Sequence, residues 1–193
     1  MSGMDLVRRA LAAVAPVADH DPAARPAAVA VILHQSADDL EALFIKRAAR
    51  AGDPWSGQIA FPGGRFEATD ADLLATAIRE SREETGIDLR AAEQLGVLDD
   101  LNPRTPTLPP IVVRPFVFGV GARPALALSP DEVERAFWLP FTELGRAGVR
   151  KEITLTLRGA PRVFPAYDLG EDVIWGMTER ILTSFLARLG PME

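Results

Sequence analysis

The segment from Gly63 to Ile87 constrains the fold of this chain more strongly than any other stretch. It reads GGRFEATDADLLATAIRESREETGI, so that a double glycine precedes a pattern with the period of a helix. Leu74, Ile78 and Ser81 stand at i, i+4 and i+7, which places them on one face. The pattern predicts a helix over residues 70–85 that begins at a polar cap and ends at a glycine. The expected cap is Asp70 or Thr69, and the expected stop is Gly86.

Three glutamates lie on this predicted helix at i, i+3 and i+4. Glu80, Glu83 and Glu84 share a face about 100° wide at roughly 100° per residue, so that their charges repel one another. Oxygen ligands gathered in this way suit Mg²⁺ or Mn²⁺, which bind carboxylate, water and phosphate oxygens. The alternative is a solvated helix face on which Arg79 and Arg82 pair with the glutamates.

The double glycine adds a second element to this pattern. Gly63 and Gly64 allow the backbone to bend and to expose N–H groups to an anion. The N-terminus of the following helix contributes partial positive charge. A glycine turn, a helix and a group of carboxylates together predict a site for a metal-bound phosphate.

The remainder of the chain combines short apolar runs with loops. The expected strands are 28–34, 42–46, 94–99, 111–120, 136–139, 154–157 and 163–167. The first two are expected to pair as a hairpin. Pro115 indicates that the strand over 111–120 is broken by a bulge or lies at an edge. Residues 19–28 and 48–60 are expected to be mostly irregular.

Two further helices are expected, one near each end of the chain. The first carries an apolar face of Leu6, Leu11 and Val14. The second spans residues 172–189, and its apolar stripe is expected to pack in the core. That stripe consists of Ile174, Met177, Ile181, Phe185 and Leu189. Strands mixed with a few helices, without regular alternation, indicate an α/β domain with a mixed sheet.

Composition limits the compartment and the class of partner. With 193 residues, 48% of them hydrophobic, and no long linker, the chain is expected to form a single domain over 1–193. A formal net charge of -6 and a pI near 5.0 argue against bulk nucleic acid as a partner. The absence of cysteine excludes disulfides and fits the cytoplasm. Because Pro16 interrupts the N-terminal apolar run and no run reaches roughly 20 residues, we expect neither a signal peptide nor a membrane partner.

The segment resembles the signature of the Nudix hydrolases, commonly written G-x5-E-x7-R-E-U-x-E-E-x-G-U, with U aliphatic. Gly64 matches its first glycine. The matches in its second half are Arg79, Glu80, Glu83, Glu84, Gly86 and Ile87. Asp70 replaces the first glutamate, with eight rather than seven residues before Arg79, and Ser81 replaces an aliphatic residue. We expect the Ser81 hydroxyl to bond the carbonyl four residues before it.

The resemblance implies an α/β/α sandwich around a mixed sheet, with the signature forming a loop–helix–loop. It also implies hydrolysis of a nucleoside diphosphate linked to another group, X, with Mg²⁺ or Mn²⁺ as the cofactor. Glu83 and Glu84 are then expected as the principal metal ligands, and Glu80 as a further ligand or as the base that activates water. Gly64 is expected to contact the metal through its backbone, and Arg79 to orient a glutamate. Glu67 and Asp70 are secondary candidates.

The segment Phe61–Asp70, FPGGRFEATD, resembles the start of this signature in coenzyme A pyrophosphatase-like Nudix proteins, FPGGxxDxxD, except at Glu67. An upstream pattern of that subgroup, LLTxRSAxxxRxxxGxxxFPGG, is matched at Arg47 but has alanine at 48 and Asp53 in place of the second arginine. Asp53 would repel a phosphate, and Arg50 is a candidate replacement. Coenzyme A or a related conjugate is the expected substrate. ADP-ribose, nucleotide sugars or damaged nucleotides are the alternatives, as is a ligand-binding module without catalysis.

The candidate substrate contacts are Arg47, Arg50, Trp55, Gly63, Arg65, Arg104 and Glu132. Trp55 either stacks on a nucleobase or packs its loop onto the core. Arg104, in a proline-rich loop, either reaches phosphate or is an ordinary surface residue. Asp131 and Glu132 either contribute to catalysis, as in some Nudix enzymes, or lie in a solvated loop. Both a monomer and a homodimer are compatible with the sequence.

Overall fold

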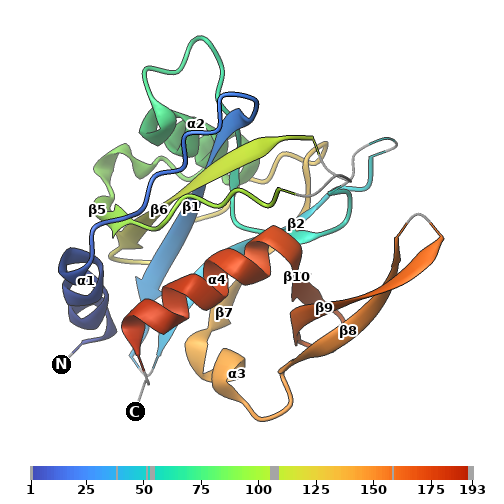
Figure 1. Ribbon diagram of the computed structural model, residues 1–193. Coiled ribbons are helices and arrows are strands. Elements are labelled where there is room, and N and C mark those ends of the chain that lie inside the picture. Colours follow the sequence, from blue (N-terminus) through green and yellow to red (C-terminus); the bar gives the residue numbers. More distant parts are fainter. Residues whose placement is uncertain are drawn as a thin grey trace.

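A mixed sheet at the centre of the molecule is covered by helices on both faces (Figure 1). The computed structural model describes residues 2–37, 39–50, 52, 55–104, 109–157 and 159–190. In these residues the central sheet contains β1 (Arg25–Gln35), β2 (Leu40–Arg47), β3 (Ile59–Ala60), β4 (Gly63–Arg65), β5 (Glu93–Val97), β6 (Ile111–Val120) and β7 (Val133–Pro140). A smaller sheet contains β8 (Arg150–Leu157), β9 (Ala160–Asp168) and β10 (Val173–Trp175). The helices are α1 (Gly3–Ala13), α2 (Leu73–Thr85), α3 (Phe141–Gly145) and α4 (Gly176–Leu189), with a short 3-10 helix, η1, at Leu89–Ala91.

Strand β1 organises the central sheet. It runs parallel to β6 over residues 25–34. Its second half forms the predicted hairpin with β2, in which Leu33 pairs with Ala42. Its first half pairs instead with β4, so that Ala28 lies opposite Gly64. The change of partner along β1 brings the glycine turn onto the sheet.

Alternate side chains of β1 pack on different helices. Ala28, Ala30 and Ile32 pack in the cluster that includes α2. Val31 and Leu33 pack in the cluster that includes α1 and α4. Because both faces of the strand are covered, it is almost continuously apolar. The predicted α/β/α sandwich around a mixed sheet is confirmed.

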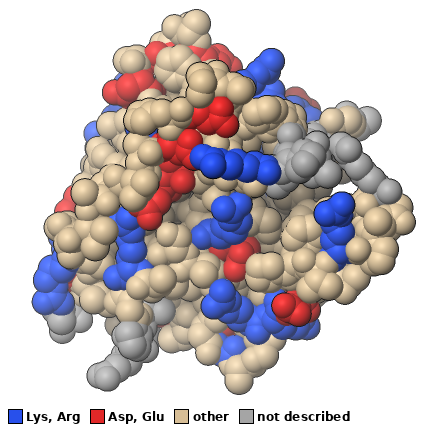
Figure 2. Space-filling view, viewed as in Figure 1, with Lys and Arg blue, Asp and Glu red and all other residues tan. Residues whose placement is uncertain are grey.

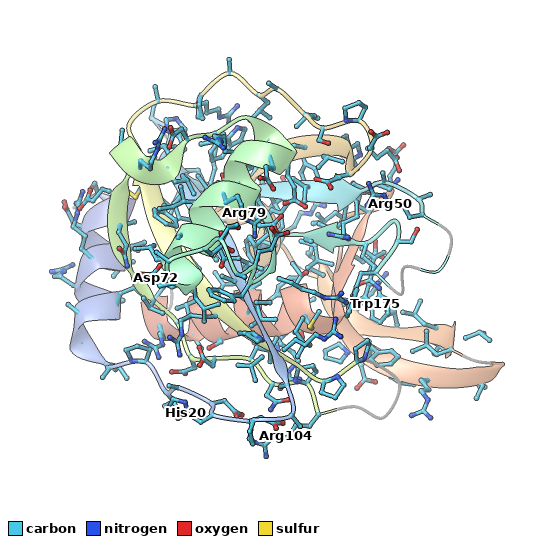
Figure 3. The ribbon with its side chains drawn as sticks, turned by 90° about the horizontal axis from the view of Figure 1, so that it is seen from above. His20, Arg50, Asp72, Arg79, Arg104 and Trp175 are labelled. Carbon is cyan, nitrogen blue, oxygen red and sulfur yellow. The ribbon has the colours of Figure 1, made fainter. Side chains whose placement is uncertain are left out.

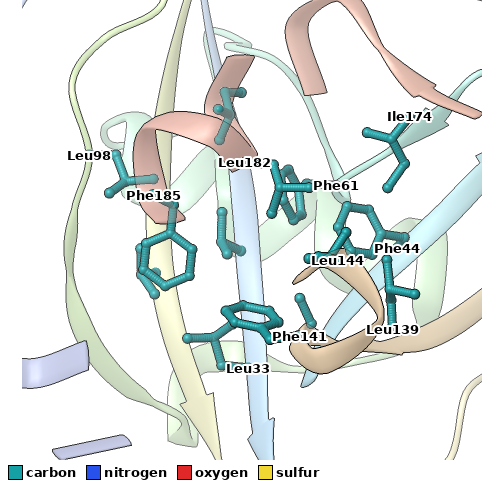
Figure 4. Packing of buried hydrophobic residues seen from close by; sticks show 14 of the residues in the cluster. Leu33, Phe44, Phe61, Leu98, Leu139, Phe141, Leu144, Ile174, Leu182 and Phe185 are labelled. Atoms are coloured by element: carbon teal, nitrogen blue, oxygen red, sulfur yellow. The ribbon is translucent and has the colours of Figure 1, made fainter. Parts of the chain in front are cut away.

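Aromatic side chains anchor α4 and the glycine turn in one core (Figure 4). Phe185 of α4 meets Phe141 edge-on, with ring centroids 6.0 Å apart. Phe61, just before the glycines, packs on Phe44 of β2 with centroids 4.7 Å apart. Burying a side chain of this size contributes about 1.5–3 kcal/mol. The positions of the turn and of α4 are therefore set by the same packing.

Helix α2 begins later than the sequence predicts. Its cap is Asp72, whose carboxylate accepts the backbone N–H of Ala75 at 2.8 Å, and neither Asp70 nor Thr69 serves. The predicted stop is confirmed, because Gly86 ends the helix at a φ of 77°. The expected bond of Ser81 to the preceding turn is wrong: its hydroxyl donates to the carbonyl of Ile87 at 3.2 Å. This bond ties the end of the helix to the segment that follows.

The two terminal helices also differ from expectation. Val7 and Leu11 are the buried residues of α1, whereas Val14 follows the helix and is 53% exposed. Residues 173–175 pair with β9 as β10, so that the buried Ile174 belongs to a strand rather than to α4. Gly176, at a φ of 68°, makes the change from strand to helix possible. None of the helices in the described part of the chain is long and apolar enough to cross a bilayer.

Pro115 lies in the interior of the central sheet, contrary to the predicted edge or bulge. Strand β6 is continuous between β1 and β5, and the register shift lies in β5, between Gln94 and Gly96. The carbonyl of Pro115 accepts the N–H of Leu98 at 3.0 Å. Proline has no N–H to return this bond, and β5 ends one residue earlier, at Val97.

The predicted loop over residues 19–28 is shorter than expected, because β1 already begins at Arg25.

Gly63 is required by the close approach of two strands. A Cβ at this position would collide with the carbonyl oxygen of Ala28 and lie 2.6 Å from the Cα of Val29. The main chain of β1 therefore occupies the place of a side chain, and only glycine fits.

Gly63→Ala is expected to destabilise the protein by about 1–3 kcal/mol, because the added methyl group overpacks the contact with β1. Gly121→Ala is the matched control, since nothing lies within 4 Å of a Cβ there. Urea unfolding measures the free energy of both variants. A Gly63→Ala protein as stable as Gly121→Ala would show that this approach is not tight.

Candidate active site

A cavity of about 570 Å³ lies where the glycine turn, α2, β1, β6 and the start of α4 meet. This is the volume of a small-molecule site. Its charged lining residues are Arg47, Arg50, Arg65, Glu67, Glu80, Glu84 and Glu132. Its uncharged lining residues include Trp55, Phe61, Ile111, Val113, Met177, Thr178 and Ile181. Charged and apolar groups therefore share one cavity but come largely from different elements.

Glu84 is almost completely buried beneath the glycine turn, with 2% of its surface exposed. The backbone N–H of Gly63 donates to its Oε2 at 2.8 Å, and Nη1 of Arg47 lies 3.7 Å from its Oε1. Burial raises the pKa of Glu84 to about 8, and the carboxylates of Glu80 and Glu132 act in the same direction. The Gly63 N–H and Arg47 only partly oppose this effect. Glu84 is therefore largely protonated at neutral pH unless additional positive charge lies beside it.

Arg79, labelled in Figure 3, is bonded to three carboxylates of this segment, those of Asp70, Glu80 and Glu83. Its Nε and Nη2 donate to the two oxygens of Asp70 at 2.9 and 3.0 Å. Its Nη1 donates to Glu80 at 2.9 Å and to Glu83 at 3.0 Å. Its Nη2 also donates to the carbonyl of Arg65 at 3.1 Å. The hydrogen bonds from Arg79 hold the pKa of Asp70 well below its usual range.

Glu80 lies against the second glycine of the turn. A Cβ at Gly64 would collide with Oε1 of Glu80 and lie 2.5 Å from its carboxyl carbon. Burial raises the pKa of Glu80, whereas Arg79 acts to lower it. Glycine at position 64 therefore allows the carboxylate to sit between the main chain of the turn and the guanidinium of Arg79.

The three glutamates do not form a ready-made set of metal ligands. In the residues that the structure describes, no three histidine or acidic side chains converge closely enough to hold an ion. Glu83 is 46% exposed, is bonded to Arg79 and does not line the cavity. Glu84 is turned toward Gly63. The three share a helix face as expected, but Glu80 and Glu83 are bonded to Arg79, whereas Glu84 is bonded to the N–H of Gly63.

The residues nevertheless fit a hard divalent cation. Glu80 and Glu84 supply oxygen donors to one cavity, and Glu132 lines it as well. The raised pKa of Glu80 and of Glu84 means that positive charge nearby would stabilise their ionised forms. Mg²⁺ and Mn²⁺ prefer such oxygens. Arg79 bonds Oε1 of Glu80, so that Oε2 could ligate a cation while Arg79 keeps its bonds to Glu80 and to Asp70.

Most of the predicted substrate contacts surround this cavity. Arg47, Arg50, Trp55, Gly63, Arg65 and Glu132 all line it. Nη2 of Arg50 lies 3.9 Å from Oε1 of Glu132, and the Arg65 guanidinium lies 6.0 Å from the centroid of the Trp55 ring. Of the two secondary candidates, Glu67 lines the cavity, whereas Asp70 does not and is bound to Arg79. Asp53 lies outside the described residues.

Arg104 is not brought to the cavity, which fits the second of its two expected roles, that of an ordinary surface residue. Its side chain is 71% exposed and its Nη2 pairs with Asp19 at 3.0 Å. Figure 3 shows it near His20 and far from both Arg79 and Arg50. The hydrogen bond of Asn102 to Asp21 holds this loop beside the N-terminal segment. Asp131, next to Glu132, is also absent from the lining.

Helix α4 contributes cavity residues that sequence reasoning missed. The sequence pattern places Met177 and Ile181 only in the core and gives Thr178 no role, yet all three line the cavity. Ile181 packs in the core and also lines the cavity: it is 5% exposed and belongs to the main apolar cluster. Helical periodicity identifies which face is buried, but not which part of that face borders a cavity. Ile111 and Val113 of β6 also line the cavity and were missed, because an apolar run predicts a strand but not what borders it.

Charged side chains on the face shown in Figure 2 are mixed in sign. Lys and Arg side chains form separate groups, divided by uncharged surface and by acidic side chains. A long polyanion is bound by a continuous basic band. The described residues of this face form no such band. That bulk nucleic acid is not a partner stays a prediction, and the charge distribution of this face agrees with it.

Comparisons with a family model and with individual proteins point to the same family. The sequence model of the NUDIX domain matches residues 24–158. A protein of Salmonella paratyphi B, called uncharacterized Nudix hydrolase NudL, is 33% identical over 136 residues, which are 70% of this chain and 68% of that one. The NudL of Salmonella newport matches to the same extent.

Solved structures agree in fold. A MutT/nudix family protein from Enterococcus faecalis has a TM-score of 0.59 and 22% identity, covering 98% of this chain and 70% of that one. The NUDIX domain of Shewanella oneidensis NrtR, complexed with ADP ribose, has a TM-score of 0.51 and 22% identity, covering 65% and 80%. The glycine turn, the glutamate-bearing helix, the sandwich and these matches together show that the chain belongs to the Nudix hydrolases, which act on the diphosphate bonds of nucleoside diphosphate derivatives and generally use divalent metal ions.

Proposed function

We propose that this chain is a metal-dependent diphosphatase for coenzyme A or a related conjugate, with residues 1–193 working as one Nudix unit. The observation that carries the proposal is the cavity that Glu80 and Glu84 share with Arg47, Arg50 and Arg65. Carboxylates suit a divalent cation, and guanidinium groups suit the oxygens of a diphosphate. The apolar part of the same cavity accommodates the remainder of a conjugate.

Mg²⁺ or Mn²⁺ is the proposed cofactor. Glu83 and Glu84 are proposed as its principal ligands, with Glu83 turning from Arg79 toward the cavity that Glu84 lines, and Gly64 as a backbone contact. Glu80 serves as a further ligand or as the base that takes a proton from the attacking water. When bound, the cation neutralises charge on the diphosphate oxygens and acidifies a bound water.

The other side chains position the substrate and the glutamates. Arg47, Arg50 and Arg65 bind phosphate oxygens. Arg79 orients the glutamates while Asp70 keeps its guanidinium in place. Water adds to one phosphorus, the bridging P–O bond breaks, and both products leave as phosphate monoesters.

Substitution of Glu83 tests the ligand assignment. Glu83→Gln is expected to lower kcat by at least about 100-fold, because the residue loses a charge that the cation needs. The fold should be unaffected, since the side chain is 46% exposed. Glu143→Gln is the matched control: it is 45% exposed and likewise paired to an arginine, Arg146, along a helix turn. Wild-type turnover in Glu83→Gln would remove Glu83 from the ligand set.

A substrate panel tests the identity of the conjugate. The panel contains coenzyme A and its thioesters, ADP-ribose, nucleotide sugars, dinucleoside polyphosphates and oxidised nucleotides, each with Mg²⁺ or Mn²⁺. The expected products from coenzyme A are phosphopantetheine and adenosine 3′,5′-bisphosphate, identified by mass spectrometry. If coenzyme A is not cleaved while ADP-ribose or a nucleotide sugar is cleaved rapidly, the substrate belongs to that other class. Binding without cleavage of any member would indicate a ligand-binding module.

The stability of the metal-free protein is expected to fall as pH rises from about 5 to 8. The pKa of Glu84 is about 8 in the folded protein and 4.5 ordinarily, so that the folded state keeps a proton that the unfolded state releases. This group can therefore lower the free energy of unfolding by at most about 1.4 kcal/mol per pH unit in that window.

Thermal unfolding in EDTA across this range measures the dependence. Glu84→Gln should make it less steep, because the amide does not ionise, and Glu80, whose pKa is also raised, accounts for the part that remains. Glu143→Gln should leave it unchanged. An identical slope in wild type and Glu84→Gln would show that Glu84 ionises normally.

A further inference from the structure

The first turns of α4 form a wall of the cavity although they lie outside the region that the family model matches, residues 24–158. We propose that Met177, Thr178 and Ile181 determine which group X the enzyme accepts, selecting an uncharged and largely apolar one. This inference rests on the proposed function, because it concerns the substrate of the same site. It assigns selectivity to a helix that carries none of the signature residues.

The position of this wall is fixed by the core. Ile174, immediately before the helix, and Leu182 and Phe185, further along it, are completely buried. Phe185 is held edge-on against Phe141. Residues 177, 178 and 181 follow the spacing i, i+1 and i+4, which groups them on one side of the helix. The wall is therefore a rigid surface rather than a loop that can adapt to any ligand.

The chemistry of this wall is uncharged. Met177 and Ile181 present a thioether and an aliphatic chain, and Thr178 presents one hydroxyl group. The acidic residue between them, Glu179, is not among the lining residues: it is 3% exposed and accepts the Thr183 hydroxyl at 2.8 Å. Nη2 of Arg150, on β8, lies 3.9 Å from Oε1 of Glu179. Arg180 is exposed. No charged side chain of α4 lines the cavity.

Strand β6 continues the uncharged surface of this wall. Ile111 and Val113 of β6 line the cavity together with α4. The charged lining residues come instead from α2, the glycine turn and the residues just after it, the end of β2, and the segments that follow β2 and precede β7. A diphosphate bound among those charges leaves X to meet α4 and β6. An apolar X gains from burial there, whereas a charged or polyhydroxylated X loses water without finding partners.

Two substrates that share adenosine diphosphate and differ only in X test this proposal. Dephospho-coenzyme A carries a long uncharged chain, and ADP-ribose carries a sugar. Wild-type enzyme is expected to favour dephospho-coenzyme A in kcat/KM. Met177→Ala and Ile181→Ala are each expected to raise KM for dephospho-coenzyme A by about 10-fold, since a lost methylene contact in such a pocket costs 10-fold or more. KM for ADP-ribose and kcat for both substrates should stay within about 2-fold.

Two further variants separate selectivity from folding. Leu186→Ala shortens a partly buried side chain of the same helix that does not line the cavity, and it should leave the substrate ratio unchanged. Thr178→Val keeps the shape of residue 178 and removes its hydroxyl group, so that the ratio should shift with an unchanged melting temperature. Equal losses for both substrates in all cavity variants, or no change in the ratio, would overturn the inference while leaving the diphosphatase intact. If wild-type enzyme cleaves neither these nor the other panel members, the proposed function fails and the inference with it.

Discussion

The guanidinium of Arg79 is the interaction on which the arrangement of the site depends. It makes five hydrogen bonds, to both oxygens of Asp70, to Glu80, to Glu83 and to the carbonyl of Arg65. Without it, three carboxylates would repel one another beside a buried fourth, Glu84. The bonds also join α2 to the loop before it and to β4. One side chain therefore offsets the local charge and fixes the geometry of the segment.

The same segment depends on two glycines for different reasons. Gly63 allows β4 to lie directly on β1, and its N–H then reaches the buried Glu84. Gly64 leaves room for the carboxylate of Glu80. A side chain at position 63 would push the turn away from β1, and one at position 64 would displace the carboxylate of Glu80. The acidic helix and the turn are thus parts of one site because the backbones come close, and β1 provides the surface on which they meet.

The cavity has two chemically distinct parts, and each follows from the layer that forms it. The side bearing α2 and the turn carries the charges, which arginines and carboxylates divide between them. The side bearing β6 and α4 is an extension of the apolar core, with Ile181 belonging to both. A ligand that fits both parts must combine a charged group with an uncharged one. The proposed conjugates have this composition.

Local pattern and spacing determined much of this protein from the sequence alone. The glutamate-bearing helix, its glycine stop, the β1–β2 hairpin and the sandwich follow from periodicity, turn residues and the family signature, which depend on neighbours along the chain. Other features were decided only by contacts between distant segments. Arg79 takes Asp70, which leaves the cap to Asp72; Asp19 holds Arg104 away from the cavity; and Pro115 is tolerated inside the sheet where β5 ends. The place of α4 beside the charged groups is of this second kind, because a helical stripe shows that a face is buried but not what lies opposite it.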